Sequence, residues 1–401
     1  MNWIRTEAEA LENELIAHRR WLHSHAEVGI DLPETKAYVR RELEKMGIDV
    51  QECGTSGLVA TVGRGISGKT ILLRADMDAL PIPEESGESF ACMGGTMHAC
   101  GHDMHTAMLL GAAKLLKAHE TELPGRVKLM FQPAEEIFEG ARDMIRHGVL
   151  ADPVPDAAVM IHVIAATTMP SGMIVLCPSG VSAPAADYFT IHVRGKGCHG
   201  STPHSGVDAL TAASHILLAL QEIHARELPP YEEAVLTIGT FHGGTAPNVI
   251  ADTATLAGTI RTFNEETRAY LKERMSAISK SIAEAYRASA SVEFGSGCPT
   301  LVNDKALIDV LHSSMQPIFG GMVLKADDLG GSMRSGGSED FAYISQEVPS
   351  VMLALAAGNA DNGYKYPQHH PAVRFDEAVL PTGVAAFVSS AFGYLSREDG
   401  N

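Results

Sequence analysis

Residues 71–81 read Ile71-Leu72-Leu73-Arg74-Ala75-Asp76-Met77-Asp78-Ala79-Leu80-Pro81, an apolar run that ends in two aspartates. A short continuous apolar run is typical of a strand that is buried on both faces of a parallel sheet. Two similar runs follow at 127–131 and 157–161, and helical patterns at 106–119 and 141–147 lie between the three runs. Strands that alternate with helices predict an α/β fold with a mainly parallel sheet covered on both faces.

A second pattern occupies residues 187–296. It contains expected strands at 187–194, 234–240, 254–261 and 291–295 and expected helices at 207–226 and 266–287. The order β-α-β-β-α-β is that of a ferredoxin-like α+β domain. The first pattern then returns, with helices expected at 304–319 and 376–396 and a buried strand at 351–356. We therefore predict a discontinuous catalytic domain, 1–186 and 297–401, with a lid domain inserted at 187–296.

The composition excludes several classes of partner. The chain has 401 residues and a formal net charge of −18, which argues against nucleic acid or an anionic membrane surface as the main partner. No continuous run of about eighteen apolar residues occurs, so no membrane span is expected. The acidic N-terminal stretch is unlike a signal peptide, and the six cysteines show no spacing typical of a disulfide framework. These features favour the cytoplasm.

Residues of types that can bind metals stand at the end of each of the three apolar runs. Asp76 and Asp78 follow the first, Glu135 and Glu136 the second, and His162 ends the third. In an open α/β sheet, sites form at the carboxyl ends of the strands, so these side chains are expected to meet at one edge. Adjacent glutamates can divide the work, because one can bind a metal while the other acts as a general base.

The segment Met97-His98-Ala99-Cys100-Gly101-His102-Asp103-Met104-His105 is the densest cluster of possible ligands. Cys100 and His102 are separated by one glycine, and thiolate and imidazole suit zinc and other transition metals. His369 and His370 lie between two prolines in a rigid loop, where one of them is a further candidate ligand. Each segment alone also fits an ordinary turn, helix start, core histidine or surface loop. The combination predicts a metal centre.

Eight segments resemble one known family in content and in order. They are RADMDALP at 74–81, MHACGHDMH at 97–105, QPAEE at 132–136, IHV at 161–163, GCHGSTPH at 197–204, GGTAPNVI at 243–250, GSEDFAY at 337–343 and HHP at 369–371. The family is the M20 metallopeptidases, and the resemblance is to its amidohydrolase branch. That branch includes enzymes similar to aminoacylase, hippurate hydrolase and auxin-conjugate hydrolase.

The resemblance implies a role for each matching residue. The metal ligands would be Cys100, His102, Glu136, His162 and His369, holding two divalent ions, manganese or zinc, with cobalt or nickel as further options. Glu135 would be the general base, and Asp78 the acid that orients a ligand imidazole. His199, on the inserted domain, would polarise the scissile carbonyl, while Asn248 and Arg261 are expected to hold the substrate carboxylate. The resemblance also implies a homodimer through the inserted domain, or a higher homo-oligomer.

These residues predict a metal-dependent amidohydrolase that cleaves the amide bond of a small N-acyl amino acid, either N-acetyl or aromatic acyl. A dipeptidase or aminopeptidase of the same fold is one alternative, and a hydrolase with Cys100 as nucleophile is another. A non-catalytic binding protein is the third, and the presence of Glu135 argues against it. Ile137 and Phe138 stand where relatives often carry glycines, and no aromatic residue closely follows His162. The acyl specificity therefore does not follow from the resemblance.

Overall fold

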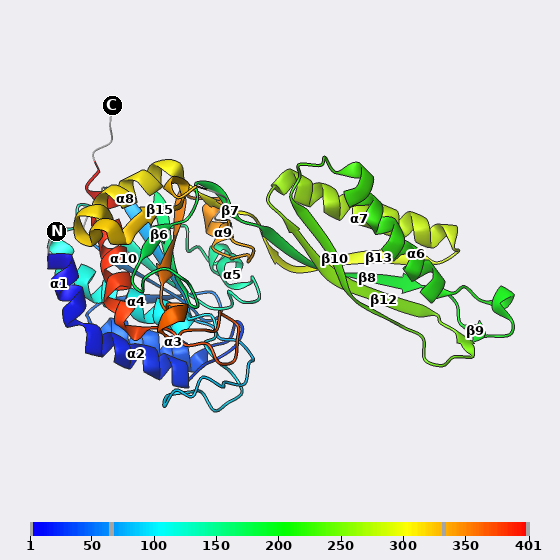
Figure 1. Ribbon diagram of the computed structural model, residues 1–401, viewed down its shortest axis with the longest axis horizontal. Helices are drawn as coiled ribbons and strands as arrows, with labels where there is room; N and C mark the ends of the chain where they lie inside the picture. The colour runs from blue at the N-terminus through cyan, green and yellow to red at the C-terminus, as the bar shows by residue number, and fades with distance from the viewer. Residues whose placement is uncertain (1–2, 64–67, 331–333, 398–401) are drawn as a thin grey trace. The chain divides into compact units, whose positions relative to one another are not determined.

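The fold is described from a computed structural model, which describes residues 3–63, 68–330 and 334–397 (Figure 1). The chain forms two compact units. Unit 1 comprises Met1–Ser182, Leu301–Arg334 and Glu339–Asn401, and unit 2 comprises Ala183–Thr300 and Ser335–Ser338. The predicted insertion, 187–296, lies within unit 2. The short segment 335–338 also clusters with unit 2, which the sequence patterns do not indicate.

Unit 1 is built on an eight-stranded sheet. Its strands are β1 (Val50–Cys53), β2 (Gly57–Val62), β3 (Thr70–Asp76), β4 (Arg126–Gln132), β5 (Ala157–Ile164), β6 (Ile174–Leu176), β15 (Val323–Lys325) and β16 (Ser350–Ala356). The order is β1-β2-β4-β3-β5-β16-β6-β15. The central strands β4, β3, β5 and β16 are mutually parallel, and β15 is parallel to β6. The pairs β1–β2, β2–β4 and β16–β6 are antiparallel. This confirms the predicted α/β class with a mainly parallel sheet.

Helices of unit 1 pack on this sheet and on one another. They are α1 (Trp3–Ala10), α2 (Glu12–Ser24), α3 (Pro33–Lys45), α4 (His102–Ala118), α5 (Gly140–Arg146), α8 (Lys305–Phe319), α9 (Ala342–Ser345) and α10 (Leu380–Leu395). Helices α1 and α2 pack on α4 and α10, and α4 also contacts α10 (Figure 1). Leu73 and Val159 of the sheet share one buried cluster with Leu109 of α4 and Phe387 of α10. The core therefore lies between the sheet and these helices.

One segment has the length and composition of a membrane span. Glu377–Leu395, which includes α10, has a mean hydropathy of 1.5 over its most apolar window, and 78% of that window is buried inside the protein. Thr382, Ser389 and Ser390 interrupt its apolar run, so the sequence pattern does not single this segment out. Burial of this extent is typical of a core helix.

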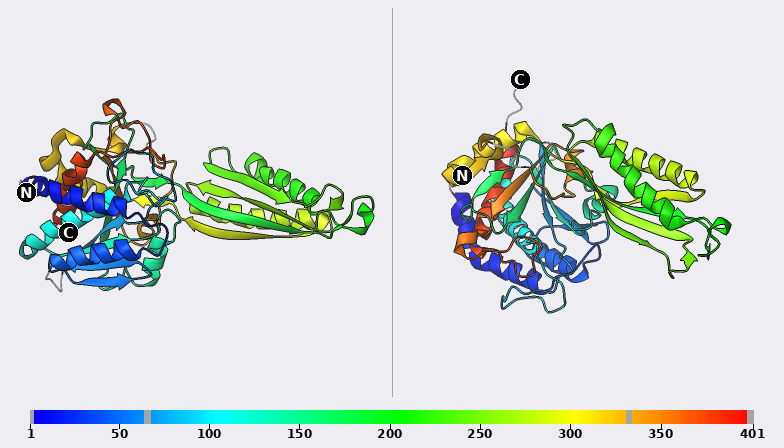
Figure 2. Two further views of the ribbon diagram at one scale, coloured as in Figure 1. Left: turned by 90° about the horizontal axis from the view of Figure 1, so that it is seen from below. Right: turned by 45° about the vertical axis from the view of Figure 1, so that its right-hand side comes forward.

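Unit 2 is an antiparallel sheet with two helices. Its strands are β8 (Ala185–Arg194), β10 (Ala234–Gly243), β12 (Thr253–Thr262) and β13 (Ser289–Cys298), in the order β10-β12-β8-β13. Helices α6 (Ala209–Glu222) and α7 (Glu265–Ala285) cover one face of the sheet (Figure 2). The chain order is the predicted β-α-β-β-α-β. Ile191 and Leu256 of the sheet pack with Ile216 of α6 and Met275 of α7, so unit 2 has a core of its own.

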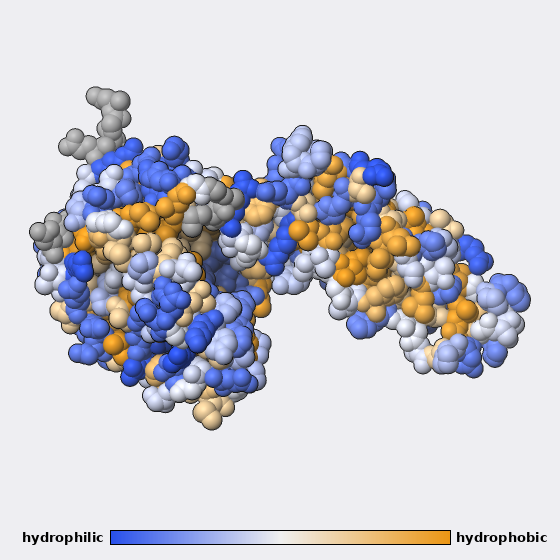
Figure 3. Space-filling view, viewed as in Figure 1, coloured by the Kyte–Doolittle hydropathy of each residue, from blue (hydrophilic) through white to orange (hydrophobic). Residues whose placement is uncertain are grey.

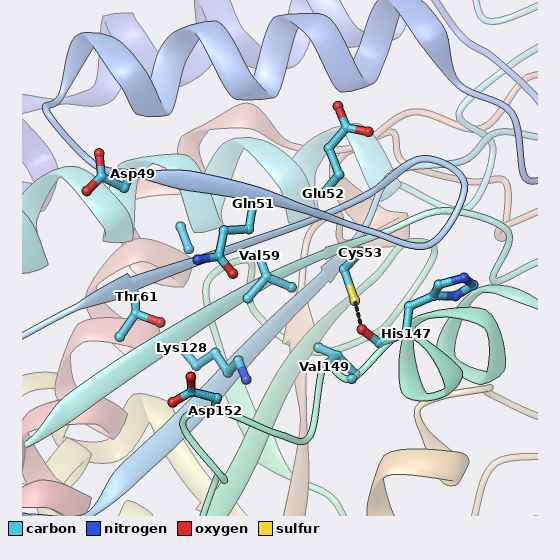
Figure 4. A pocket seen from close by; sticks show the side chains of 12 residues that line it. Asp49, Gln51, Glu52, Cys53, Val59, Thr61, Lys128, His147, Val149 and Asp152 are labelled. Carbon is cyan, nitrogen blue, oxygen red and sulfur yellow. Dashed lines mark hydrogen bonds between the residues drawn. The ribbon is translucent and has the colours of Figure 1, made fainter.

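Two cavities lie away from the predicted site residues. One, of about 260 Å³, lies against β1, β2 and β4 in unit 1 (Figure 4). Lys128 lines it and donates hydrogen bonds to the carbonyl oxygens of Ala151 and Pro153, which ties the neighbouring loop to the sheet. The other is a groove of about 420 Å³ between α6 and α7, lined in part by Ile278 and Ile282. Apolar side chains gather over these helices in Figure 3.

Candidate metal centre

The predicted ligands of unit 1 meet at the carboxyl edge of the parallel strands. Strand β3 ends at Asp76, β4 ends at Gln132, and His162 lies near the end of β5. Helix α4 begins at His102 beside the same edge, directly after Gly101 at φ +89°. A Cβ atom on Gly101 would lie 2.4 Å from Val163 Cγ2, so this turn requires glycine.

The five predicted ligands form two groups of three that share Cys100. Within each group the potential ligand atoms all lie within 4.8 Å of one another: Cys100, His102 and His162 form the first group, and Cys100, Glu136 and His369 the second. Cys100 Sγ lies 3.6 Å from His162 Nε2, and His369 Nε2 lies 3.5 Å from Glu136 Oε2. The structure thus brings together five residues from four separate segments.

The buried ring of His102 and the half-buried ring of His162 both direct Nε2 toward this cluster. His102 Nδ1 lies 2.9 Å from the carbonyl oxygen of Asp78, and His162 Nδ1 lies 2.8 Å from that of Val163. A carbonyl oxygen only accepts hydrogen bonds, so the proton of each neutral ring is on Nδ1 and Nε2 is free. Burial lowers the pKa of His162 to about 3, which keeps this ring neutral.

The donor set fits a transition metal. Sulfur at about 2.3 Å and nitrogen at about 2.1 Å from one tetrahedral zinc stand about 3.6 Å apart, the separation of Cys100 Sγ and His162 Nε2. His102 Nε2 and Glu136 Oε1 are buried and make no hydrogen bond to any described residue. Because unpaired buried polar atoms are costly, these two atoms favour a bound cation.

Glu135 lies beside this cluster, in surroundings that raise its pKa. Its side chain is buried, and its Oε2 lies 3.9 Å from His102 Nε2. Burial, followed by the charges of Glu339 and Glu136, raises the pKa of Glu135 well above its ordinary value. A carboxylate that binds a proton this readily has the property required of a general base.

Asp78 connects the glutamate turn to His102. Its two carboxylate oxygens accept the backbone N–H groups of Glu135, at 3.0 Å, and Glu136, at 3.1 Å. Its Oδ1 also lies 3.3 Å from His102 Nδ1. One buried carboxylate therefore fixes the orientation of three residues of the cluster.

The match to known proteins follows the same motifs. The model of peptidase family M20/M25/M40 matches residues 72–392, which include all five predicted ligands. The chain belongs to this family. It is 37% identical to the N-acetyl-L-cysteine deacetylase of Bacillus subtilis (strain 168) over 372 residues, covering 92% of this chain and 85% of that protein. It is 36% identical to IAA-amino acid hydrolase ILR1-like 4 of Arabidopsis thaliana over 387 residues, covering 95% of this chain and 86% of that protein.

A solved structure agrees with this assignment. The Bacillus subtilis YXEP protein, described as a dinuclear metal binding peptidase from the M20 family, has a TM-score of 0.78 and 32% identity. The superposition covers 96% of this chain and 99% of that chain. The predicted family, and with it a hydrolase that acts on amide bonds, is confirmed.

This M20 chain also contains a network of buried ion pairs that the sequence motifs do not predict. Arg74 is fully buried and donates to Asp76 Oδ2 at 2.6 Å, Glu339 Oε1 at 2.9 Å and Asp340 Oδ1 at 2.8 Å. Glu339, Asp340 and Glu135 offer carboxylate oxygens within 4.8 Å of one another. The adjacent acids in GSEDFAY and the arginine inside a buried strand were the available signals. Arg74 and Glu339 lie 265 residues apart, so the sequence does not show that they pair.

His105 is a second residue without an assigned role. Its Nδ1 donates to Asp76 Oδ1 at 2.6 Å, and its Nε2 accepts the backbone N–H of Val163 at 2.9 Å. Val163 directly follows His162, so His105 ties the end of β5 to the end of β3. His105, the third histidine of MHACGHDMH, therefore holds the backbone next to the predicted ligand His162.

The fifth predicted ligand is held by its backbone. His369 has φ +66°, and its N–H donates to the carbonyl oxygen of Ala99 at 2.9 Å. Its side chain is 54% exposed, in contrast to the buried ring of His102 and the half-buried ring of His162. A non-glycine residue at positive φ is strained, a feature that is common at functional sites.

The remaining predicted residues lie in unit 2. His199 is in β9 (Cys198–His199), which pairs with β11 (Val249–Ile250), so Asn248 lies beside it. The backbone N–H of Ser201 donates to His199 Nδ1 at 3.1 Å, so the proton of the neutral ring is on Nε2. Arg261 lies near the opposite end of β12 and donates to Ser338 Oγ. Unit 2 therefore brings His199 and Asn248 together and separates both from Arg261.

Proposed function

We propose that this chain hydrolyses the amide bond of N-acyl amino acids and releases a carboxylate and a free amino acid. The observation that carries the proposal is the convergence of five ligand-type side chains in two groups that share Cys100, beside the buried Glu135. The deacetylase and the IAA-amino acid hydrolase that resemble the chain act, by their names, on acylated amino acids. Their names support both N-acetyl and aromatic acyl groups.

Two divalent metal ions are part of this proposal. Cys100, His102 and His162 would hold one ion, and Cys100, Glu136 and His369 the other. Such ions polarise a substrate carbonyl and lower the pKa of water. The mixed sulfur, nitrogen and oxygen ligands favour zinc or manganese, with cobalt or nickel as further options.

The protein side chains would then move the proton and place the substrate. Glu135 Oε2 accepts a proton from the attacking water and returns it to the leaving amine nitrogen. Asp78 keeps the backbone of Glu135 and the ring of His102 in place through the contacts described above. His199 Nε2–H is the proposed donor to the substrate carbonyl oxygen, because its Nδ1 is occupied by the Ser201 N–H.

We also propose a homodimer through unit 2. Asn248 and Arg261 are the proposed partners of the substrate carboxylate, yet they lie toward opposite ends of β12 (Thr253–Thr262). At about 3.3 Å per residue, a ten-residue strand spans roughly 30 Å, so one chain does not bring both to one carboxylate. Two copies, each contributing one of these residues, would do so. Sedimentation velocity of the purified chain tests the dimer.

The cytoplasm is the proposed compartment. Cys100 is a free thiol. Cys100 would serve as a ligand only while it is reduced, which favours a reducing compartment. Subcellular fractionation tests this location.

The deciding experiment compares substrates, metals and one variant. Metal-stripped protein is assayed on N-acetyl, N-benzoyl and longer N-acyl amino acids and on free-amine dipeptides, before and after addition of Zn²⁺ or Mn²⁺. Glu135→Gln is expected to lower kcat by about 10²–10⁴-fold while bound metal, measured by mass spectrometry, is unchanged. Glu139→Gln is the matched control, because Glu139 lies in the same turn and pairs with Arg142.

Each other outcome points to a different function. Faster hydrolysis of dipeptides than of N-acyl amino acids would make the chain a dipeptidase. Full activity in stripped protein, lost on alkylation of Cys100, would favour the cysteine nucleophile. Metal binding without hydrolysis of any substrate would leave a binding protein.

A further inference from the structure

Asp103 directly follows the proposed ligand His102. One of its carboxylate oxygens, Oδ2, faces helix α2. Asp103 Oδ2 accepts a hydrogen bond from Arg19 Nε and another from His23 Nδ1, each at 2.9 Å. The side chains of all three residues are at most 3% exposed. Two residues near the N-terminus thus hold the start of α4, where the Cys100 and His102 ligands are attached.

His23 also holds a second segment. Its Nε2 donates to Glu84 Oε1 at 3.0 Å, and Glu84 Oε2 accepts the backbone N–H of Cys92 at 2.8 Å, which closes the loop 84–92. Because both ring nitrogens donate to carboxylates, His23 is an imidazolium. Burial lowers its pKa, but the hydrogen bonds to Asp103 and Glu84 outweigh burial and raise the pKa to about 9.

The loop 84–92 leads to the last ligand. The N–H of Glu85 donates to the carbonyl oxygen of Pro371 at 2.8 Å, two residues after His369. In the same loop, Phe90 lies under the guanidinium of Arg19, with 5.0 Å between its ring centre and Cζ, and packs edge-on against His23 at 5.3 Å. Arg19 and His23 therefore both contact Phe90, in the loop that is hydrogen-bonded to the His369 segment.

Arg19 reaches the C-terminal part of unit 1 directly. Arg19 Nη1 lies 3.0 Å from Glu377 Oε1, and Arg20 Nη2 lies 2.7 Å from Glu377 Oε2. Glu377 follows the His369 segment along the chain. The charges of this cluster balance, since three cations, Arg19, Arg20 and His23, face the three anions Asp103, Glu84 and Glu377. Because the charges balance, the cluster leaves no uncompensated buried charge, which would be strongly destabilising.

We propose that Arg19 and His23 are positioning residues that hold the Cys100–His102 segment and the His369 segment in place before metal binds. The inference rests on the proposed function, because it assumes that these residues are ligands. The two segments lie more than 260 residues apart, and His369 is exposed and strained. Without an existing scaffold, metal binding would also have to order these segments, and affinity would fall.

The test is metal affinity of the stripped protein, measured by competition with a chromophoric chelator. His23→Gln removes the charged connection to Asp103 and Glu84 and is expected to weaken metal binding by at least about 10-fold. His18→Gln is the matched control. His18 is a buried histidine on the same helix, bonded through Nδ1 to the hydroxyl of Tyr38 at 2.8 Å, and it makes no hydrogen bond or ion pair to Asp103. Its variant is expected to bind metal within about 2-fold of wild type.

A spectroscopic measurement separates positioning from general stability. Co²⁺ bound to a thiolate has an absorption band from sulfur-to-metal charge transfer, so Co²⁺ substitution reports the geometry at Cys100. His23→Gln is expected to shift or weaken this band at saturating Co²⁺, and His18→Gln to leave it unchanged. The double variant Arg19→Lys/His23→Gln is expected to lose less affinity than the sum of the single losses, because both residues act through Asp103.

The outcomes distinguish this inference from the proposed function. If wild type binds two ions and hydrolyses N-acyl amino acids, but His23→Gln equals wild type in affinity and spectrum, only the positioning role is wrong. Equal losses in His18→Gln and His23→Gln would also overturn it, because they indicate general destabilisation. If wild type binds no metal, both the proposed function and the positioning role fall.

Discussion

Asp78 illustrates how much a single buried carboxylate controls at the residue scale. It accepts the N–H groups of Glu135 and Glu136 and approaches His102 Nδ1, so the proposed base and two proposed ligands share one support. None of these contacts involves the predicted ligand atoms themselves. Supports of this kind set the direction of a ligand and are sensitive to small changes.

Asp78→Asn is expected to lower metal affinity by about 10–100-fold. The amide has one acceptor oxygen, so one backbone N–H of the glutamate turn would face an NH₂ group. The measurement is the dissociation constant for Zn²⁺ in the stripped variant. Asp156→Asn serves as control, because Asp156 accepts the N–H of Thr70 at the opposite end of β3. Equal affinity in wild type and Asp78→Asn would contradict the role of Asp78.

The buried imidazolium of His23 predicts a pH dependence of stability. Its pKa is raised from 6.5 to about 9 in the folded protein, so folding favours the protonated form. The contribution, on the order of 3 kcal/mol, is fully present below pH 6.5 and is lost as pH rises through about 9. Of the nearby groups, Arg19 and His98 oppose the protonated form of His23, and Asp103 and Glu84 favour it.

The check is the free energy of unfolding of stripped protein between pH 6 and pH 10, in wild type and His23→Gln. The difference between the two is expected to shrink as pH rises. A difference that is constant over this range would show that His23 is neutral in the folded state.

At the element scale, the turn between β4 and α5 is the most constrained part of the centre. It carries Glu135 and Glu136, and it places Ala134 and Phe138 at φ +56°. Its last residue, Gly140, begins α5. A Cβ atom on Gly140 would lie 1.5 Å from the carbonyl oxygen of Pro133, so the turn closes only with glycine.

Gly140→Ala is therefore expected to cost about 1–3 kcal/mol of stability and to lower bound metal, since the turn must open. Thermal unfolding and metal content measure the two effects. Gly321→Ala is the control, because a Cβ atom there meets nothing within 4 Å. Unchanged metal content in a folded Gly140→Ala variant would show that the turn tolerates the displacement.

Some elements followed from the sequence and others did not. The buried strands β3, β4 and β5 were predicted because their apolar runs are continuous. The patterns gave no strand for β1, which contains Gln51 and Glu52 and forms the edge of the sheet. An edge strand buries little, so its apolar signal is weak.

At the scale of the whole molecule, the two units have separate cores, and the proposed metal ligands belong only to unit 1. Metal at about 100 times its dissociation constant is expected to stabilise unit 1 by about 2.7 kcal/mol. Hydrogen exchange of β3 and β5, compared with β8 and β12, measures the two units separately. Slower exchange in unit 1 alone is expected. Equal slowing in both would show that the units unfold together.

The sequence by itself determined the α/β class, the inserted α+β pattern, the family and the identity of the candidate ligands. Apolar periodicity and local motifs carry this information, because each depends on residues close together in the chain. Only the tertiary structure decided that Cys100 is shared by two ligand groups, that Arg74 pairs with Glu339 and Asp340, and that Arg19 and His23 support the centre. These are contacts between residues far apart in the chain. They form because buried charges and polar atoms need partners, and folding determines which partners are within reach.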